Sequence, residues 1–201
     1  MLLPNLLQEL IQKISKLPGI GQRQATRIVF YLISKKEELK EILEGLKSIE
    51  KEIVVCPSCF FPYQKTTFLK ECPLCSHPKR RKDIICVVEK ETDLLTIEET
   101  KKFNGLYHIL GGLISPVDAS SYQNIRIKKL LERIQKNKIK EVILALPSTP
   151  QGEITTLYLE RLLKKYPLKV SILGKGIPTG GEIEFADPQT IEAAFKHRES
   201  L

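Results

Sequence analysis

The feature that most constrains this chain is a set of four cysteines arranged in two pairs. Each pair has the pattern Cys-Pro-x-Cys, and twelve residues separate the pairs: Cys56, Cys59, Cys72 and Cys75. A two-residue gap lets both sulfurs of a pair reach one metal ion, and four thiolates satisfy the tetrahedral preference of zinc. Because four protein ligands leave no position open for water or substrate, the pattern predicts one structural zinc ion per chain.

Composition places the chain among soluble proteins with a polyanionic partner. A disulfide framework would fit a secreted chain, but the first residues, 1–5, lack the charged start and small-residue cleavage site of a signal peptide. No apolar run approaches the length of a membrane span, so we expect a cytoplasmic protein with no membrane partner. The net charge of +8 over 201 residues favours nucleic acid as the partner.

Residues 1–52 are expected to form helices joined by a tight turn. Apolar residues recur at helical spacing after Pro4 and again between residues 25 and 32. The sequence Leu-Pro-Gly-Ile-Gly at 17–21 separates these two stretches, which indicates a turn. From 35 to 51, Lys and Glu alternate around one apolar stripe, which predicts a third, solvated helix.

The turn in this region is a candidate DNA-binding site. Gly19 and Gly21 permit positive φ, so the backbone N–H groups of the turn and of the next helix can face outward together. Arg23 and Arg27 are four residues apart and project from one side, where they can reach neighbouring phosphates. The segment resembles a helix-hairpin-helix motif, which contacts the DNA backbone without reading sequence. The alternative is a plain helical hairpin with solvated arginines.

Residues 53–82 are expected to form a small zinc finger around the four cysteines. Its aromatic residues could stack on bases, but such residues more often cover a metal site as a miniature core. They are Phe60, Phe61, Tyr63 and Phe68. The basic run at 79–82 is either a phosphate contact or a hinge between modules.

Residues 83–201 show short β-branched runs that alternate with helical stretches, which predicts an α/β domain with a parallel sheet and flanking helices. The strands are expected at 84–89, 106–110, 141–146 and 169–173, and the helices at 93–102, 125–136 and 154–165. Cys86 lies in the first strand and is interpreted as a small buried hydrophobe. The glycine-rich stretch at 174–181 lacks the spacing of a nucleotide-binding loop, so we expect no ATP binding.

Functional groups of parallel sheets gather beyond the carboxyl ends of the strands. In this chain that rule selects Glu89, the loop 111–118 and Glu153. We expect them to form an acidic cleft that contacts partners. The arrangement resembles a Toprim domain. In active Toprim enzymes a glutamate assists proton transfer and an Asp-x-Asp pair holds Mg²⁺. That pair is missing here, because Glu153 is the one carboxylate in 147–153.

The order of helix-hairpin-helix, four-cysteine zinc finger and Toprim-like domain resembles the RecR family of bacterial recombination mediators. Supporting segments are 17–27, the two cysteine pairs, 107–116, 152–159 and 174–187. The resemblance implies a non-enzymatic, nucleoid-associated DNA-repair protein, which forms a homotetramer, clamps DNA and acts with RecO and RecF to load RecA at single-stranded gaps. One departure is that Pro147–Gln151 replaces the Asn-Pro-Thr run that is usual in the family.

Two alternative functions stay open at this point. A Mg²⁺-dependent Toprim nuclease or primase would use the same acidic cleft, with Glu89 required for turnover. A zinc-stabilised scaffold without DNA affinity would use its positive charge on acidic protein partners. The apolar residues near the N-terminus, Leu6, Leu7 and Leu10, fit either a core within their own chain or an interface between copies.

Overall fold

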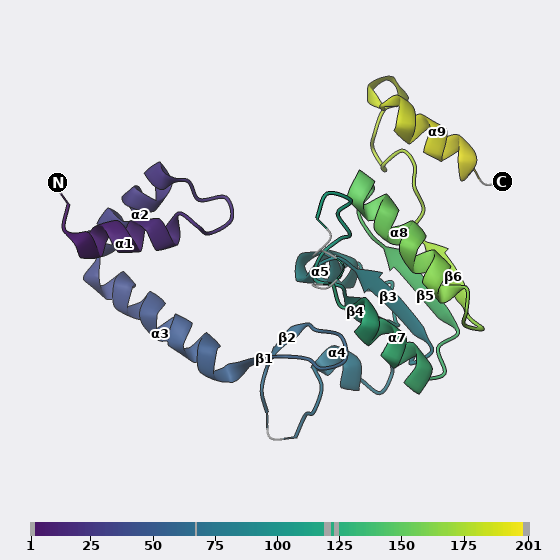
Figure 1. Ribbon diagram of the computed structural model, residues 1–201, viewed down its shortest axis with the longest axis horizontal. Helices are drawn as coiled ribbons and strands as arrows, with labels where there is room; N and C mark the ends of the chain where they lie inside the picture. The colour runs from purple at the N-terminus through teal and green to yellow at the C-terminus, as the bar shows by residue number, and fades with distance from the viewer. Residues whose placement is uncertain (1–2, 67, 119–121, 123–124, 199–201) are drawn as a thin grey trace. The chain divides into compact units, whose positions relative to one another are not determined.

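The computed structural model describes residues 3–66, 68–118, 122 and 125–198 (Figure 1). The chain divides into two compact units, Met1–Val54 and Val55–Leu201, and each is described by itself. The expected division into three parts, at 52/53 and 82/83, is finer than this one and stays a prediction.

Within its described residues, the first unit contains three helices: α1 Asn5–Ile14, α2 Gln22–Ser34 and α3 Lys36–Glu52. Pro4 immediately precedes α1, and a small core forms where buried Ile11 of α1 meets Ala25 and Val29 of α2. Every residue of α3 keeps part of its surface exposed, including its apolar stripe. The three predicted helices are present, and the third is solvated as expected.

The second unit begins with the cysteine segment. Its regular elements are short: β1 Ile53–Val55 and β2 Pro62–Gln64, which pair in a two-stranded sheet, and α4 Pro73–Ser76. β1 spans the boundary between the two units.

The main sheet of the second unit has four parallel strands in the described part of the chain. They are β3 Ile84–Val88, β4 Leu106–Ile109, β5 Glu141–Ala145 and β6 Lys169–Ile172, in the order β4-β3-β5-β6. β3 and β5 are therefore central, whereas β4 and β6 are the edges. The predicted α/β class and all four predicted strands are confirmed, each strand ending one residue earlier than expected.

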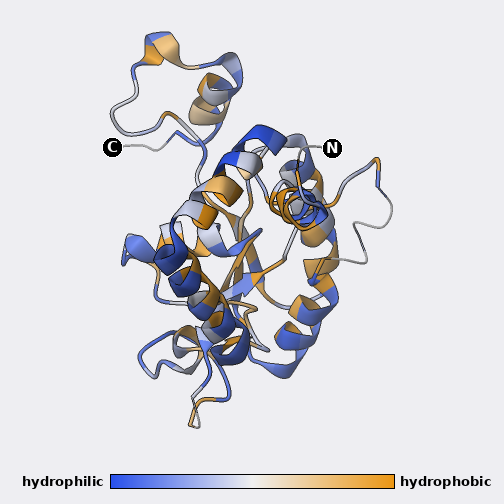
Figure 2. Ribbon diagram, turned by 90° about the vertical axis from the view of Figure 1, so that its left-hand side faces the viewer, coloured by the Kyte–Doolittle hydropathy of each residue, from blue (hydrophilic) through white to orange (hydrophobic). Residues whose placement is uncertain are grey.

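Helices and the cysteine segment bury both faces of this sheet. The helices are α5 Glu91–Glu99, α7 Ile127–Lys136 and α8 Pro150–Leu163. Ile85 and Val87 of β3 face the apolar sides of α7 and α8, while Cys86 and Val88 face α5 and the cysteine segment. Parallel sheets covered on both faces have nearly continuous apolar strands, and Figure 2 shows the strands mainly in the hydrophobic colour.

The start of α8 differs from the prediction by four residues. The helix begins at Pro150 instead of 154, because the Thr149 side chain accepts a hydrogen bond from the Gly152 N–H at 3.2 Å and Pro150 occupies the first helical position. Glu153 consequently lies in the first turn of a helix and not in a loop.

The C-terminal segment contains two elements that apolar periodicity did not predict, the 3-10 helix η1 Ile183–Phe185 and the helix α9 Pro188–Lys196. Asp187 caps α9, since its Oδ1 accepts hydrogen bonds from the N–H groups of Gln189 and Thr190, both at 3.0 Å. Asp-Pro before an amphipathic stretch is a helix-start signal that could have located α9 in the sequence.

Candidate metal centre and nucleic-acid interface

The structure brings the four predicted metal ligands together. Cys56, Cys59, Cys72 and Cys75 are all buried, and their Sγ atoms lie within 4.8 Å of one another. Four convergent thiols form a donor set that suits a soft or borderline divalent cation. Among the residues that the structure describes, this is the one group of three or more potential ligands able to hold a metal ion.

Tight turns place both sulfurs of each pair on the same side of the backbone. In the first pair the Phe60 N–H donates to the Cys56 backbone oxygen at 2.9 Å, and Phe60 adopts a positive φ of 69°. In the second pair the Cys75 N–H donates to the Cys72 backbone oxygen at 3.0 Å. The Cys72 N–H donates to the Cys56 sulfur at 3.4 Å, so a backbone donor also connects the two pairs.

The close thiols perturb one another strongly. Hydrogen bonding from Cys59 is the largest effect that lowers the pKa of the Cys56 thiol, and the same contact raises the pKa of Cys59. Such a cluster shares its protons and favours one thiolate over its neighbours. A bound divalent cation would stabilise all four thiolates, because metal-bound thiols are deprotonated.

The aromatic residues of the segment mostly support the metal site, as predicted. Phe61 and Tyr63 pack against the cysteine cluster, and Phe60 packs between the segment and the sheet. The Arg126 guanidinium lies 4.6 Å from the centroid of the Phe60 ring. Phe68 was expected among these residues, but it is 94% exposed and covers nothing in the cluster.

Three residues of the basic run at 79–82 make internal contacts. Arg80 is largely buried, donates to the Gly105 backbone oxygen at 2.9 Å and forms an ion pair with Glu98. The Arg81 guanidinium binds Asp83, and the Lys82 ammonium donates to the Cys75 backbone oxygen at 2.6 Å. Arg80 and Lys82 thereby connect the run to the residue before β4 and to the second cysteine pair, which argues against a hinge at this point.

The predicted DNA-binding residues lie around an open turn at the start of α2. Gly19 has a φ of +77°, Gly21 precedes the first residue of α2, and a Cβ on either would meet no atom within 4 Å. Ile20 between them packs against the small core of the unit. Arg23 and Arg27 are exposed. The turn can therefore present the first N–H groups of α2, with two guanidinium groups nearby, to an anion.

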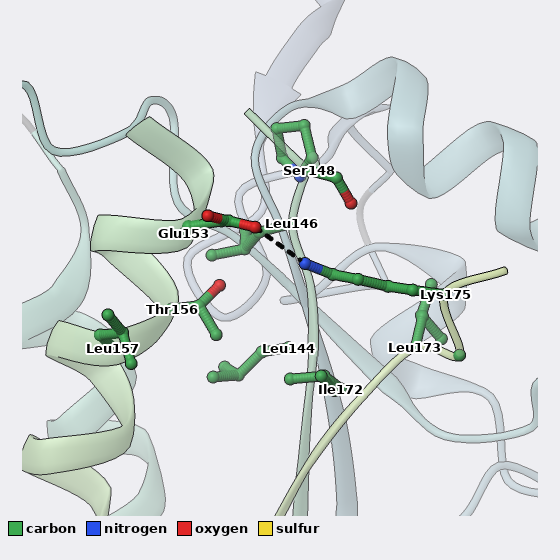
Figure 3. Close-up of a pocket in the computed structure, with 11 residues that line it drawn as sticks. Leu144, Leu146, Ser148, Glu153, Thr156, Leu157, Ile172, Leu173 and Lys175 are labelled. Carbon is green, nitrogen blue, oxygen red and sulfur yellow. Dashed lines mark hydrogen bonds and ion pairs between the residues drawn. The ribbon is translucent and has the colours of Figure 1, made fainter. Parts of the chain in front are cut away.

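The structure places Glu89 directly after β3 and Glu153 in the first turn of α8. The Glu89 backbone oxygen accepts a hydrogen bond from the Gly111 N–H at 2.8 Å. The Glu153 carboxylate forms an ion pair with Lys175 at 3.1 Å, and both line a pocket of about 490 Å³ at the ends of β5 and β6, where the two side chains point toward each other (Figure 3). Glu89 is not among the described residues that line this pocket. An acidic cleft shared by Glu89 and Glu153 stays a prediction.

Two arginines that matter here were not selected from the sequence, Arg126 and Arg133. Both project from the N-terminal end and body of α7 toward the cysteine segment. One signal could have identified them. Between residues 126 and 140 they are the two arginines, and all the remaining cations are lysines. Arginine makes several directed hydrogen bonds from a planar group, so its choice over lysine indicates fixed contacts.

Together these parts define a class of protein that combines a helical hairpin with an exposed glycine turn, a four-thiol metal site and a parallel α/β domain. Three family models match the chain: "RecR, helix-hairpin-helix" over residues 7–45, "Toprim domain" over 83–174 and "RecR, C-terminal" over 176–199.

The curated relatives include recombination protein RecR of Trichlorobacter lovleyi, 40% identical over 97% of this chain and 96% of the relative. The same protein of Moorella thermoacetica is 39% identical over 98% of both chains, and that of Thermobifida fusca is 37% identical over 97% and 96%. The chain therefore belongs to the RecR family, which confirms the resemblance seen in the sequence and gives it a role in DNA recombination and repair. Across the described residues, no helix combines the length and apolar character needed to cross a membrane.

Proposed function

We propose that the protein is a non-enzymatic DNA-binding mediator that clamps DNA and acts with RecO and RecF to load RecA at single-stranded gaps. The observation that carries the DNA-binding step is the open Gly19–Gly21 turn, with Arg23 and Arg27 exposed beside it. Backbone N–H groups at a helix N-terminus bind phosphate oxygens of any sequence, and the two guanidinium groups add charge-assisted contacts.

A titration of end-labelled gapped DNA across a salt series, with Mg²⁺ present, tests this proposal. We expect a shifted and intact DNA band, with an affinity that falls as salt rises at a slope of about 0.9 per phosphate neutralised. The double variant Arg23→Ala/Arg27→Ala should bind more weakly and reduce the salt slope by about two, because two phosphate contacts are lost.

Lys40→Ala/Lys47→Ala serves as the matched control, since it removes two exposed cations of the same unit from α3 and leaves the turn intact. Its affinity and slope should stay close to those of the unchanged protein. If the double arginine variant kept the original affinity and slope, the turn would not be the DNA contact.

We propose zinc as the ion of the four-cysteine site. The support is chemical: four buried thiols, closed to further ligands, form the donor set typical of structural zinc. Metal analysis of reduced protein should find one zinc per chain, and markedly less than one would overturn the assignment. The zinc would hold the short cysteine segment in its fold, where binding is coupled to folding.

The proposed partners include further copies of this chain in a homotetramer. In the first unit, α1 and α3 expose large apolar side chains, among them Leu6 at 76% and Leu46 at 57%. Large apolar side chains that stay exposed in this way are candidates for an interface between copies. Glu89 and Glu153 are proposed to face protein partners such as RecO or RecF, and Glu153→Ala should weaken RecO binding in a pull-down if that is so.

A Mg²⁺-dependent nuclease or primase is the second candidate, favoured by the Toprim match and by Glu89 at the end of β3. Denaturing gels of the same titration distinguish it. Shortened DNA, or DNA extended when nucleoside triphosphates are added, would support an enzyme if the change disappears with Glu89→Gln, whereas unchanged strands support the mediator.

A further inference from the structure

One side chain contacts both cysteine pairs and the main sheet at the same time. Nη1 of Arg133, from α7, donates to the backbone oxygen of Ser58 at 2.9 Å and to that of Tyr107 at 2.6 Å. Nη2 of the same group lies 3.7 Å from the Sγ atom of Cys75. Ser58 lies within the first pair, Cys75 belongs to the second, and Tyr107 belongs to β4.

The contact with Tyr107 is made at the outer edge of the sheet. In the sheet that the described residues form, β4 is an edge strand, so no strand of that sheet pairs with its outward N–H and C=O groups. The Ile109 N–H donates to the Cys59 backbone oxygen at 3.0 Å, and the Tyr107 backbone oxygen accepts from Arg133. The cysteine segment and one guanidinium thus take the place of a further strand along β4.

The contact with Cys75 brings positive charge to the metal ligands. Four thiolates around a divalent cation carry a net charge of −2, and burial makes uncompensated charge expensive. Lys82 also approaches the site, but its ammonium binds the backbone oxygens of Cys75 and His77, not a sulfur. In the described part of the chain, Arg133 is the side chain outside the four cysteines for which a hydrogen bond to a ligand sulfur is found.

We propose that Arg133 is a positioning residue for the metal centre, which holds both cysteine pairs around the ion and ties metal retention to the α/β domain. This inference rests on the proposed metal site. Outer residues that hydrogen-bond to ligands orient them, and their loss commonly weakens metal binding by about 10–100-fold. Arginine suits the role because its planar fork satisfies three acceptors in fixed directions, whereas lysine is a point charge on a flexible stem.

The rate of metal release from the protein tests this proposal directly. Zinc-loaded Arg133→Met and Arg133→Lys would be mixed with a chromogenic chelator, and the release rate would be followed at a temperature where circular dichroism shows both variants folded. We expect release from Arg133→Met to be about 10–100-fold faster than from the unchanged protein. Arg133→Lys should release metal at an intermediate rate, since it restores charge but not the three directed contacts.

Lys136→Met is the matched control, because Lys136 is an exposed cation on the same helix one turn further on. Its release rate should equal that of the unchanged protein. A second readout is the sulfur-to-cobalt absorption of the Co²⁺-substituted protein, which should shift in both Arg133 variants and not in the control. A role for Arg133 confined to general stability would leave that spectrum unchanged.

Release rates within about twofold of the unchanged protein in both folded Arg133 variants would overturn the proposal, since the loss of an outer contact commonly costs far more. If Arg133→Met does not fold, the release rate of Arg133→Lys alone is compared with that of the unchanged protein, and the same twofold limit applies. Absence of metal from the unchanged reduced protein would instead refute the metal site itself, so the two failures are distinguishable.

Discussion

His108 shows how a single buried residue sets the response of this fold to acid. It lies in β4, is fully buried, and its Nε2–H donates to the Arg126 backbone oxygen at 3.1 Å. The Phe60 ring contacts it edge-on, with centroids 5.4 Å apart. Burial, followed by the positive charge of Arg133, lowers the pKa of His108 to about 3. The imidazole is therefore neutral in the folded protein at physiological pH.

This depressed pKa predicts a loss of stability as pH falls below about 6.5. In the unfolded chain the imidazole takes up a proton near pH 6.5, whereas in the folded chain it stays neutral down to about pH 3. Protonation therefore favours unfolding throughout that window, by up to about 1.4 kcal/mol per pH unit. Urea unfolding of zinc-saturated protein between about pH 5 and 6.5, above the range of ordinary carboxylates, should show this slope added to that of the thiols, which take up protons when the metal is released. His108→Gln should reduce the total slope by up to about 1.4 kcal/mol per pH unit.

His197→Gln is the control for this prediction, because His197 is exposed near the end of α9. Its slope should match that of the unchanged protein. An equally steep slope in His108→Gln would mean that another group governs the acid response.

At this scale, the sequence predicted residues that occur in a pattern and not those that act alone. The four cysteines were found because their spacing is itself the chemical requirement. Arg133 and His108 carry no such spacing, since each acts through a contact made by tertiary packing. In a helix rich in cations, one arginine with three fixed contacts differs from its neighbours only by residue type.

Among the elements, α8 has a start that leaves no room for a side chain at one position. Gly152 lies in its first turn, where a Cβ would fall 1.9 Å from the Pro147 oxygen. That oxygen belongs to the backbone and cannot move without shifting the turn between β5 and α8. The backbone of the segment that begins at Pro147 thus packs directly against Gly152 and leaves no room for a side chain there.

Gly152→Ala is expected to destabilise the protein by about 1–3 kcal/mol, the usual range for overpacking, even though alanine favours helices. Gly45→Ala is the matched control, since Gly45 lies in α3 with nothing within 4 Å of an added Cβ. It should be neutral or stabilise by up to about 1 kcal/mol. Urea unfolding measures both variants, and equal effects would contradict the role of the close contact.

The elements themselves were predictable where periodicity was long or strands were buried on both faces. β3 and β4 follow from their apolar runs, whose burial on both sides leaves little freedom of register. The edge strand β6 has fewer apolar residues and is partly exposed, and its prediction rested on Val170 and Ile172. The start of α8 and the whole of α9 depend instead on single capping residues, Thr149 and Asp187. Periodicity ignores such residues, so boundaries and short helices were missed.

For the whole molecule, the exposed apolar stripe of α3 bears on assembly. Ile42, Leu43, Leu46 and Ile49 recur at helical spacing and are between 46% and 57% exposed. Leu46→Glu should shift the sedimentation profile toward smaller species if this stripe is an interface, because a buried carboxylate without a partner is costly. Ser48→Glu adds the same charge to the exposed surface of the same helix and should leave the profile unchanged.

Loss of assembly in Ser48→Glu, or its retention in Leu46→Glu, would place the contact between copies elsewhere. Sequence patterns indicated the modules and their order, but the number of copies has no sequence signal of its own. The sequence pattern of an apolar residue such as Leu6 is the same whether the residue packs within one chain or between two. The 76% exposure of Leu6 in the structure shows that it is not part of the core of its own unit.

The cysteine segment and the Arg133 side chain cover the outer edge of β4, and this gives metal binding a consequence beyond stability. If the first cysteine pair detached, the Ile109 N–H and its neighbours would be offered to any extended chain nearby, since an uncovered flat strand is a template for pairing. If the site holds the proposed zinc, a shortage of that metal would leave a protein that is prone to aggregate as well as one that is less stable. A bound ion would therefore protect the solubility of the protein as well as its fold.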